Sequence, residues 1–299
     1  MRYDGGHKRD TFVSDVLARF VEWVPVCPEL ESGLGVPRPP MRLVRDRAGV
    51  RLVEVQSGRD HTRTVERWAS ARVRSLRRLQ LCGYVLKKDS PSCGMERVTI
   101  YGRRGMPERA GTGIYARALR EAFPDLPVEE EERLRDPELR ENFIERVFAY
   151  ARLRELSRGR WTRARVVAFH TRHELQLMAH SPAAHRALGR RVTELSNAAS
   201  AAFRRRYAAD FMAALARIAT RGRNASVLHH CVGHFERALD AASRAELAAL
   251  IDDYRRGLVP LVMPITLIRH HVRRHAITYL SDQTYLEAHP KELMLRNHG

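Results

Sequence analysis

Cysteine is scarce in this sequence, and its scarcity excludes several classes of protein. The 299 residues include only 4 cysteines and no CxxC pair, so a disulfide framework is excluded and a zinc ribbon or thioredoxin-type redox pair is disfavoured. No apolar run approaches the roughly 20 residues that cross a bilayer. The N-terminal MRYDGGHKRD has no apolar segment of the signal-peptide kind. We expect a cytoplasmic protein without membrane contact.

Acidic residues are also in short supply, and unevenly so. The net charge is +18, but residues 1–150 hold 28 Lys and Arg against 23 Asp and Glu, whereas residues 151–299 hold 25 against 12. A basic half attracts polyanions through counterion release. This asymmetry favours nucleic-acid contact by the second half. The excess of 49 Arg over 4 Lys suits RNA binding but equally reflects a GC-rich genome, and so decides nothing.

The chain is long enough for two domains. In residues 1–128 apparent strands at 23–26, 51–55 and 83–86 alternate with helical spacing at 11–22, 61–80 and 111–123, which predicts an α/β domain with a mainly parallel, Rossmann-like sheet. The proline-rich, acidic residues 129–138 are predicted to be a linker. Residues 139–299 show helical spacing nearly throughout and are predicted to form a basic all-α domain, with residues 182–217 as one helix.

Two turns carry the most suggestive chemistry. Cys27-Pro28-Glu29 and Ser90-Pro91-Ser92-Cys93-Gly94 each follow an apparent strand and place a thiol beside a group that handles protons. Brought together, they would form a metal or iron–sulfur pocket. The alternatives are a capping or surface carboxylate for Glu29 and plain turn chemistry for Ser90. Cys82 and Cys231 are interpreted as buried, structural thiols.

Histidines and arginines form further groups in the second half. The pairs His230/His234 and His271/His275 have i,i+4 spacing, but no HExxH occurs, and the string from His170 to Glu174 has the wrong order. We therefore favour core or RNA-facing histidines over a zinc site. Arginines interleaved with Trp161 and Tyr207 indicate phosphate contact with base stacking, although solvated helix faces are the common alternative. The predicted RNA-binding residues are Arg160, Arg163, Arg165, Arg204, Arg205, Arg206, Arg273 and Arg274.

Several longer strings resemble known families. RYDGGHKRD (2–10), VPVCPELESGLGVPRPPMRLV (24–44), SGRDHT (57–62) and GYVLKKDSPSCGMERVTIY (83–101) resemble the DUF523, or thiouracil desulfurase, family. LSRGRWTRARVVAFHTRHELQLMAHSP (156–182), SVLHHCVGHF (226–235), YRRGLVPLVMPITLIRHHVRR (254–274) and YLSDQTYLEAHPKELMLRNH (279–298) resemble DUF1722, related to the bacterial YbgA proteins. The fused arrangement resembles enzymes that desulfurate 4-thiouridine, including in tRNA.

The resemblance implies an iron–sulfur mechanism. In such enzymes three cysteines hold a 4Fe–4S cluster, and its fourth iron keeps an open position for the sulfur of a thiocarbonyl base. Water replaces the sulfur with the help of a carboxylate. The resemblance makes Cys27 and Cys93 cluster ligands, Glu29 the proton-handling carboxylate and Ser90 the substrate-side hydroxyl.

One departure from the family is a missing cysteine. The family's third ligand lies a few residues before the string that corresponds to RYDGGHK, whereas this chain begins at Met1. We expect a misassigned gene start, with the first strand and the third cysteine encoded upstream. The predicted function is conversion of a thiolated uracil, as 4-thiouridine nucleotide or in tRNA, to uracil with release of sulfide. The alternative is a non-catalytic RNA-binding protein with a degenerate desulfurase domain.

Overall fold

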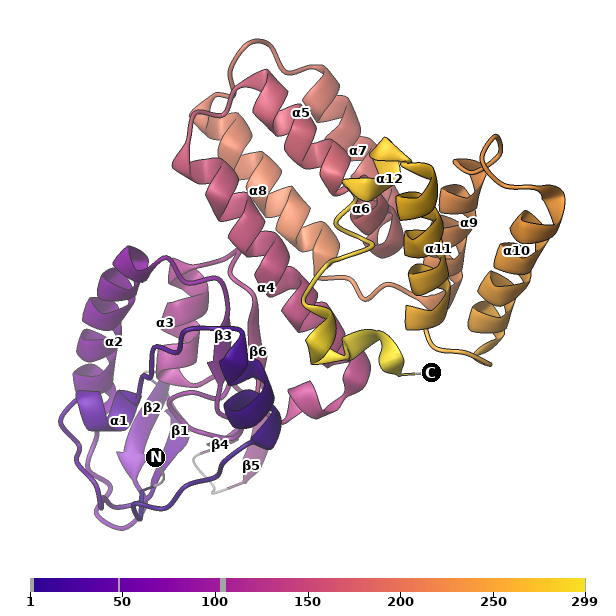
Figure 1. The fold of residues 1–299 in the computed structure, drawn as a ribbon. Coiled ribbons are helices and arrows are strands. Elements are labelled where there is room, and N and C mark those ends of the chain that lie inside the picture. Colours follow the sequence, from indigo (N-terminus) through magenta and orange to yellow (C-terminus); the bar gives the residue numbers. More distant parts are fainter. Residues whose placement is uncertain (1–2, 48, 103–105, 299) are drawn as a thin grey trace. The chain divides into compact units, whose positions relative to one another are not determined.

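The chain divides into two compact units, Met1–Arg135 and Asp136–Gly299. The structure is a computed structural model that describes residues 3–47, 49–102 and 106–298 (Figure 1). Each unit has its own hydrophobic core and is described by itself.

The N-terminal unit contains two small sheets. The larger has the order β2-β1-β4-β5, in which β1 and β4 are parallel and the other two pairs are antiparallel. The smaller is a parallel pair of β3 and β6. The strands are β1 (Met41–Asp46), β2 (Gly49–Glu54), β3 (Tyr84–Leu86), β4 (Val98–Tyr101), β5 (Pro107–Gly111) and β6 (Val128–Glu130).

The prediction of an α/β unit is confirmed, but the prediction of a mainly parallel sheet is wrong because the larger sheet is mixed. Only short connections join β1 to β2 and β4 to β5. Connections this short permit antiparallel pairing only, since a parallel pair needs a crossover of about a dozen residues or more. The smaller sheet includes residues 129 and 130, so the predicted linker begins within a strand.

Two helices provide most of the core of this unit. Helix α2 (Thr62–Leu76) packs against α3 (Ile114–Ala122), and the rings of Trp68 and Tyr115 lie 5.1 Å apart (Figure 1). The helical spacing predicted for residues 61–80 agrees with α2, in which Val65, Ala69, Val73 and Leu76 are buried. Their 3–4 residue spacing places them on one stripe.

The C-terminal unit is all-helical over its described residues, as predicted. Its helices are α4 (Pro137–Arg158), α5 (Arg163–Arg172), α6 (Glu174–His180), α7 (Pro182–Thr193), α8 (Ala201–Leu215), α9 (Arg221–Gly233), α10 (Ala241–Arg256), α11 (Val262–His275) and α12 (Thr278–Ser281). Side-chain oxygens of Asp136, Thr162, Ser181, Ser200, Thr220 and Asp240 cap the first amides of six of them. Such caps fix where each helix begins. The cap at Ser200 starts a new helix, so the single helix predicted for residues 182–217 is wrong.

This unit has two hydrophobic clusters. One lies among α4, α5, α7 and α8 around Tyr207 and Phe211, and the other lies among α9, α10 and α11 around Phe235 and Ile268. No helix in the described parts of the chain is both long and apolar enough to pass through a membrane.

Candidate functional site

Cys27 lies at the start of a short helix in the N-terminal unit. It is the N-cap of α1 (Pro28–Glu31), and its backbone N–H donates to Glu31 Oε1 at 3.1 Å. The preceding residues 23–26, predicted as a buried strand, form no strand, and Trp23 is exposed. Pro25 lacks the N–H that a strand interior needs. The helix start, rather than a sheet edge, therefore positions the thiol.

Glu29 is a buried carboxylate at the centre of the site. Its Oε2 lies 3.6 Å from Cys27 Sγ, and its Oε1 accepts a hydrogen bond from Ser90 Oγ at 3.4 Å. The nearest cation is Arg38, whose Nη2 lies 3.8 Å from Oε2. Glu29 is only 7% exposed, so its carboxylate is largely removed from water. Cys27, Ser90 and Arg38 are its polar neighbours.

The second thiol turn is held by the start of α3. Ser90 Oγ accepts from the N–H groups of Ser92 and Cys93 at 3.2 and 3.1 Å. The Ser92 carbonyl accepts from the N–H groups of Tyr115 and Ala116 at 2.9 and 3.2 Å. Because the free amides of a helix start need acceptors, the helix fixes the turn and with it the Cys93 side chain.

The two turns meet at one cavity of about 980 Å³. Cys27, Glu29, Ser90 and Cys93 all line it. The fold therefore brings together the four residues predicted to form the site. The hydrogen bond between Glu29 and Ser90 joins residues that are 61 positions apart in the sequence. Sequence reasoning missed Arg38, which was seen only as part of a Gly- and Pro-rich loop. A cation between prolines in such a loop was the available signal.

The electrostatics of the cavity favour a metal. Burial, followed by the negative charges of Glu29 and Cys27, raises the pKa of the Cys93 thiol well above its ordinary value. The neighbouring negative charges thus disfavour the Cys93 thiolate in this partly dry space. Bound metal would favour the thiolate forms and relieve this repulsion, so the donor set fits two corners of an iron–sulfur cluster.

The other two cysteines lie elsewhere. Cys82 precedes β3, whereas Cys93 follows it, and Cys231 is buried in α9 of the C-terminal unit. Within the described residues, Cys27 and Cys93 are the thiols that line the cavity. A 4Fe–4S cluster is usually held by four cysteines, so these two thiols can supply only part of the ligand set.

Cations border the same cavity. Lys8, Arg9, Arg38, Lys87 and Lys88 line it, together with His7. Lys87 and Lys88 form ion pairs with Glu131 and Glu132 respectively. Those carboxylates neutralise part of the lysine charge and hold both side chains in place. Arg9 and Arg38 likewise lie against the carboxylates of Asp15 and Glu29.

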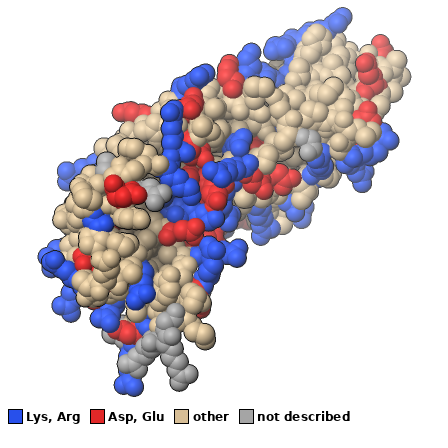
Figure 2. Space-filling view, turned by 90° about the horizontal axis from the view of Figure 1, so that it is seen from below, with Lys and Arg blue, Asp and Glu red and all other residues tan. Residues whose placement is uncertain are grey.

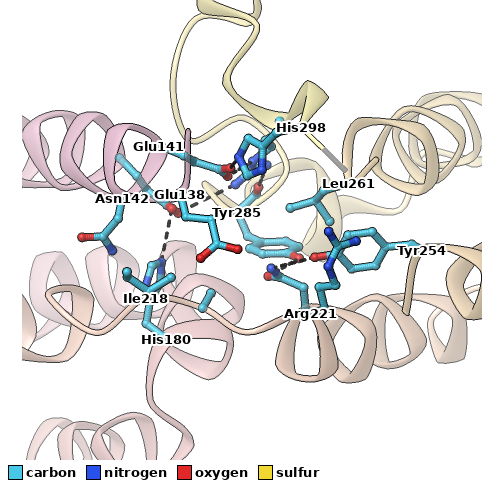
Figure 3. Close-up of a pocket in the computed structure, with 14 residues that line it drawn as sticks. Glu138, Glu141, Asn142, His180, Ile218, Arg221, Tyr254, Leu261, Tyr285 and His298 are labelled. Atoms are coloured by element: carbon cyan, nitrogen blue, oxygen red, sulfur yellow. Dashed lines mark hydrogen bonds and ion pairs between the residues drawn. The ribbon is translucent and has the colours of Figure 1, made fainter. Parts of the chain in front are cut away.

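A second, small polar cavity of about 60 Å³ lies within the C-terminal unit (Figure 3). Glu145 Oε2 lies 3.2 Å from His180 Nε2, and Glu141 accepts from Arg296 Nε at 3.1 Å. Burial alone would raise the pKa of Glu145, but the charges of His180 and Arg296 outweigh it and hold that pKa well below its usual range. Burial likewise opposes protonation of His180, yet Glu145 raises the pKa of His180. We interpret this charged network as an internal support of the helices.

The arginines predicted to bind RNA occupy two regions of the C-terminal unit. Residues 162 and 198 form a β-bridge, so α5 and α8 begin side by side. This brings two of the groups to one end of the helices: Arg160, Arg163, Arg165, Arg204, Arg205 and Arg206, all exposed. Arg273 and Arg274 are exposed in the last turn of α11, where the helix dipole also favours cations. On the face in Figure 2, basic side chains are interrupted by acidic ones.

The base stacking expected from Trp161 and Tyr207 is wrong. Trp161 is 5% exposed and Tyr207 is fully buried, and their rings meet edge to face with centroids 6.1 Å apart. Helix phase turns Tyr207 of α8 into the core, and Trp161, which lies two residues before α5, is buried beside it, while the neighbouring arginines face solvent. The exposed arginines can still contact phosphate groups, but the buried rings of Trp161 and Tyr207 cannot stack on bases.

The N-terminal unit combines an α/β fold with a thiol–carboxylate cavity, and the C-terminal unit is helical and basic. Residues 1–131 match the family described as 2-thiouracil desulfurase, and residues 174–290 match DUF1722, a family of unknown function. The chain belongs to both: it has an N-terminal 2-thiouracil desulfurase domain and a C-terminal DUF1722, YbgA-like domain.

Two known proteins are similar to parts of this chain. The uncharacterized protein YbgA of Escherichia coli K12 is 33% identical over 155 residues, which cover 52% of this chain and 92% of YbgA. Among solved structures, a [4Fe-4S]-dependent thiouracil desulfidase, TudS, is 30% identical over 45% of this chain and 84% of its own, with a TM-score of 0.35. On the family match over residues 1–131, the N-terminal domain is homologous to a thiouracil desulfurase.

Proposed function

We propose that this protein is an iron–sulfur-dependent desulfurase that converts a thiolated uracil to uracil with release of sulfide. The observation that carries the proposal is the position of Glu29, whose carboxylate lies 3.6 Å from the Cys27 thiol and 3.4 Å from the Ser90 hydroxyl. Cys93 lines the same cavity. A proton-handling group and two metal-binding thiols thus share one space.

The residues divide the chemistry among them. Cys27 and Cys93 would hold the cluster, and the bound cluster supplies a Lewis acid that polarises a thiocarbonyl sulfur. Glu29, largely shielded from solvent, takes a proton from the attacking water and returns it to the departing sulfur. Ser90, fixed by two backbone amides, donates to Glu29 and orients this carboxylate toward the cavity. Arg38 places a positive charge 3.8 Å from the Oε2 atom of Glu29.

The preferred substrate in this proposal is 4-thiouridine as a nucleotide or within tRNA. Five Lys and Arg side chains line the cavity. A free base offers them no phosphate to bind, whereas a nucleotide does. We expect a lower KM for 4-thiouridine monophosphate than for 4-thiouracil. Equal KM values for the two compounds would contradict the assignment of these cations to phosphate.

The test of the proposed chemistry is sulfide release from 4-thiouridine monophosphate by anaerobically reconstituted protein. Glu29→Gln should lower kcat by at least about 100-fold, the usual contribution of a general acid–base group, and leave the visible iron–sulfur absorption unchanged. Glu96→Gln, which changes an exposed carboxylate of the same domain, is the matched control. Retained turnover in Glu29→Gln removes Glu29 from the mechanism. A colourless, inactive wild-type protein would favour the alternative of a non-catalytic RNA-binding protein.

The helical domain, in the same proposal, binds the tRNA. Arg204, Arg205 and Arg206 lie on the first two turns of α8, beside the start of α5. Replacing all three by Ala should flatten the dependence of log Kd on log salt by about 2 to 3, since each phosphate contact contributes about 0.7 to 0.9. The control replaces Arg63, Arg67 and Arg74, exposed on α2. An unchanged slope places the RNA surface elsewhere.

A further inference from the structure

Three side chains outside both cavities come together where α5, α6 and α7 follow one another. His170 lies in α5, Glu174 begins α6 and His185 lies in α7. One ligand atom from each of the three lies within 4.8 Å of the others. We propose that these residues form a binding site for a divalent transition-metal ion of the zinc type.

The orientation of His170 supports the site. Its Nδ1 is 3.1 Å from the Tyr207 hydroxyl, whereas its Nε2 is buried without a hydrogen-bond partner, and the residue is only 4% exposed. Buried polar atoms almost always have a partner, so the bare nitrogen calls for a ligand. A second partner on the far nitrogen is typical of a metal-binding histidine, because it fixes the ring.

Glu174 and His185 complete the donor set. Tyr279 donates to Glu174 Oε2 at 3.0 Å, which orients the carboxylate and leaves its other oxygen for a metal. The rings of His170 and His185 are parallel, with centroids 6.2 Å apart. Gly189, one turn after His185, lies against His170 Nε2; a Cβ there would be 3.6 Å from this nitrogen. A larger residue at 189 would crowd the space beside Nε2.

The distances and protonation states suit a metal. Ligands about 2.1 Å from a tetrahedral zinc ion lie about 3.4 Å apart, so small side-chain rotations would close the site. Burial, followed by the charge of His185, lowers the pKa of His170 to about 4, and burial also lowers the pKa of His185. Both imidazoles are then neutral near pH 7, the form that binds metal.

Two histidines and one carboxylate are a donor set of catalytic zinc and of non-haem iron. Three protein ligands leave a position for water or for a ligand. Glu174 and His185 are only partly buried, so solvent can reach the ion. The site therefore differs in ligand type and in domain from the thiol cavity, and its existence does not depend on the proposed desulfurase chemistry.

The test is zinc binding by the full chain, produced without a histidine tag and stripped with chelator. Cys27→Ser/Cys93→Ser serves as the background, so that thiols cannot bind the zinc. Calorimetry should give one tight equivalent of Zn²⁺, and His185→Gln and Glu174→Gln should each weaken it by at least about 100-fold. Circular dichroism confirms that both variants fold. His229→Gln, which removes an exposed histidine of α9, should bind like the background protein.

Two results would overturn the assignment. One is zinc affinity in His185→Gln and Glu174→Gln equal to that of the background protein, which would assign the zinc to other histidines. The other is a background protein that takes up no tight equivalent. Cobalt(II) absorption provides the spectroscopic check, since a low-coordinate site with imidazole ligands gives visible bands that His185→Gln should lose.

Discussion

Gly113 is the position where a single methyl group should disturb the thiol cavity. A Cβ at residue 113 would lie 2.4 Å from the carbonyl carbon and oxygen of Ser92 and 2.7 Å from Cys93 N. These are backbone atoms and cannot rotate away. The backbone angles of Gly113, φ −61° and ψ 145°, are open to alanine. The cost of Gly113→Ala is therefore steric: the start of α3 must move away from the Cys93 turn.

The size of the effect follows from two opposing terms. Overpacking lowers the free energy of unfolding by about 1–3 kcal/mol. Alanine also restricts the unfolded chain more than glycine does, which raises the free energy of unfolding by about 0.4–1 kcal/mol. We expect Gly113→Ala to lower the free energy of unfolding of the N-terminal domain by about 1–2 kcal/mol. The displaced Cys93 should also reduce the iron bound after reconstitution.

Urea unfolding followed by tryptophan fluorescence measures this effect. Trp161 is replaced by Phe in every protein, so that Trp23 and Trp68 report on the N-terminal domain. Gly102→Ala is the control, because among the residues that the structure describes its Cβ would meet nothing closer than 3.7 Å. We expect a change within about 0.5 kcal/mol. Equal stability and equal iron content in Gly113→Ala and Gly102→Ala would refute the argument that α3 positions the thiol.

Two further predictions concern the cysteines and the buried charges. Cys27→Ser and Cys93→Ser should each abolish the visible iron–sulfur absorption after reconstitution, whereas Cys82→Ser should keep it; equal loss in all three would deny the thiols distinct roles. The ion pair of Glu145 and His180 should make stability depend on pH. The lowered pKa of Glu145 contributes stability that is lost as pH falls below about 4.5, and the raised pKa of His180 contributes stability that is lost as pH rises above about 6.5. The difference in unfolding free energy between wild type and the double Gln variant should therefore peak between these values, and a flat difference from pH 4 to 9 would contradict it.

The parts of the cavity that the sequence predicts are those with local signals. A proline follows Cys27, and a proline and a glycine lie around Cys93; these residues mark turns. Both turns line the cavity, as the sequence predicted. Prolines flank Arg38 as well, but no local signal reports its contact with Glu29, because the two residues meet only through the folding of a loop. The sheet was mispredicted for a related reason: β5 has the sequence PERAG and is mostly exposed, so it shows neither the alternation nor the apolar run of a strand.

The helical domain shows the same limit for functional residues. Trp161 stands among arginines in sequence, yet it lies in the core, because neighbours on a helix or at its start point in different directions. His170, Glu174 and His185 come from three helices, so no spacing rule such as HExxH identifies them. Their proximity depends on how α5, α6 and α7 pack, which periodicity does not report.

The Ser90–Gly94 turn is attached to α3, so the position of the Cys93 thiol and the shape of the rest of the cavity depend on different segments of the chain. The part of the lining that contains Cys93 is tied to a core helix, whereas the part that contains Arg38 belongs to the loop of residues 32–40. Under the proposed function, substitutions in that loop at positions other than Arg38 can reshape what the cavity admits while the Cys93 turn stays in place. Relatives of this protein could thus diverge in the size of the thiolated compound they accept and still share one reaction.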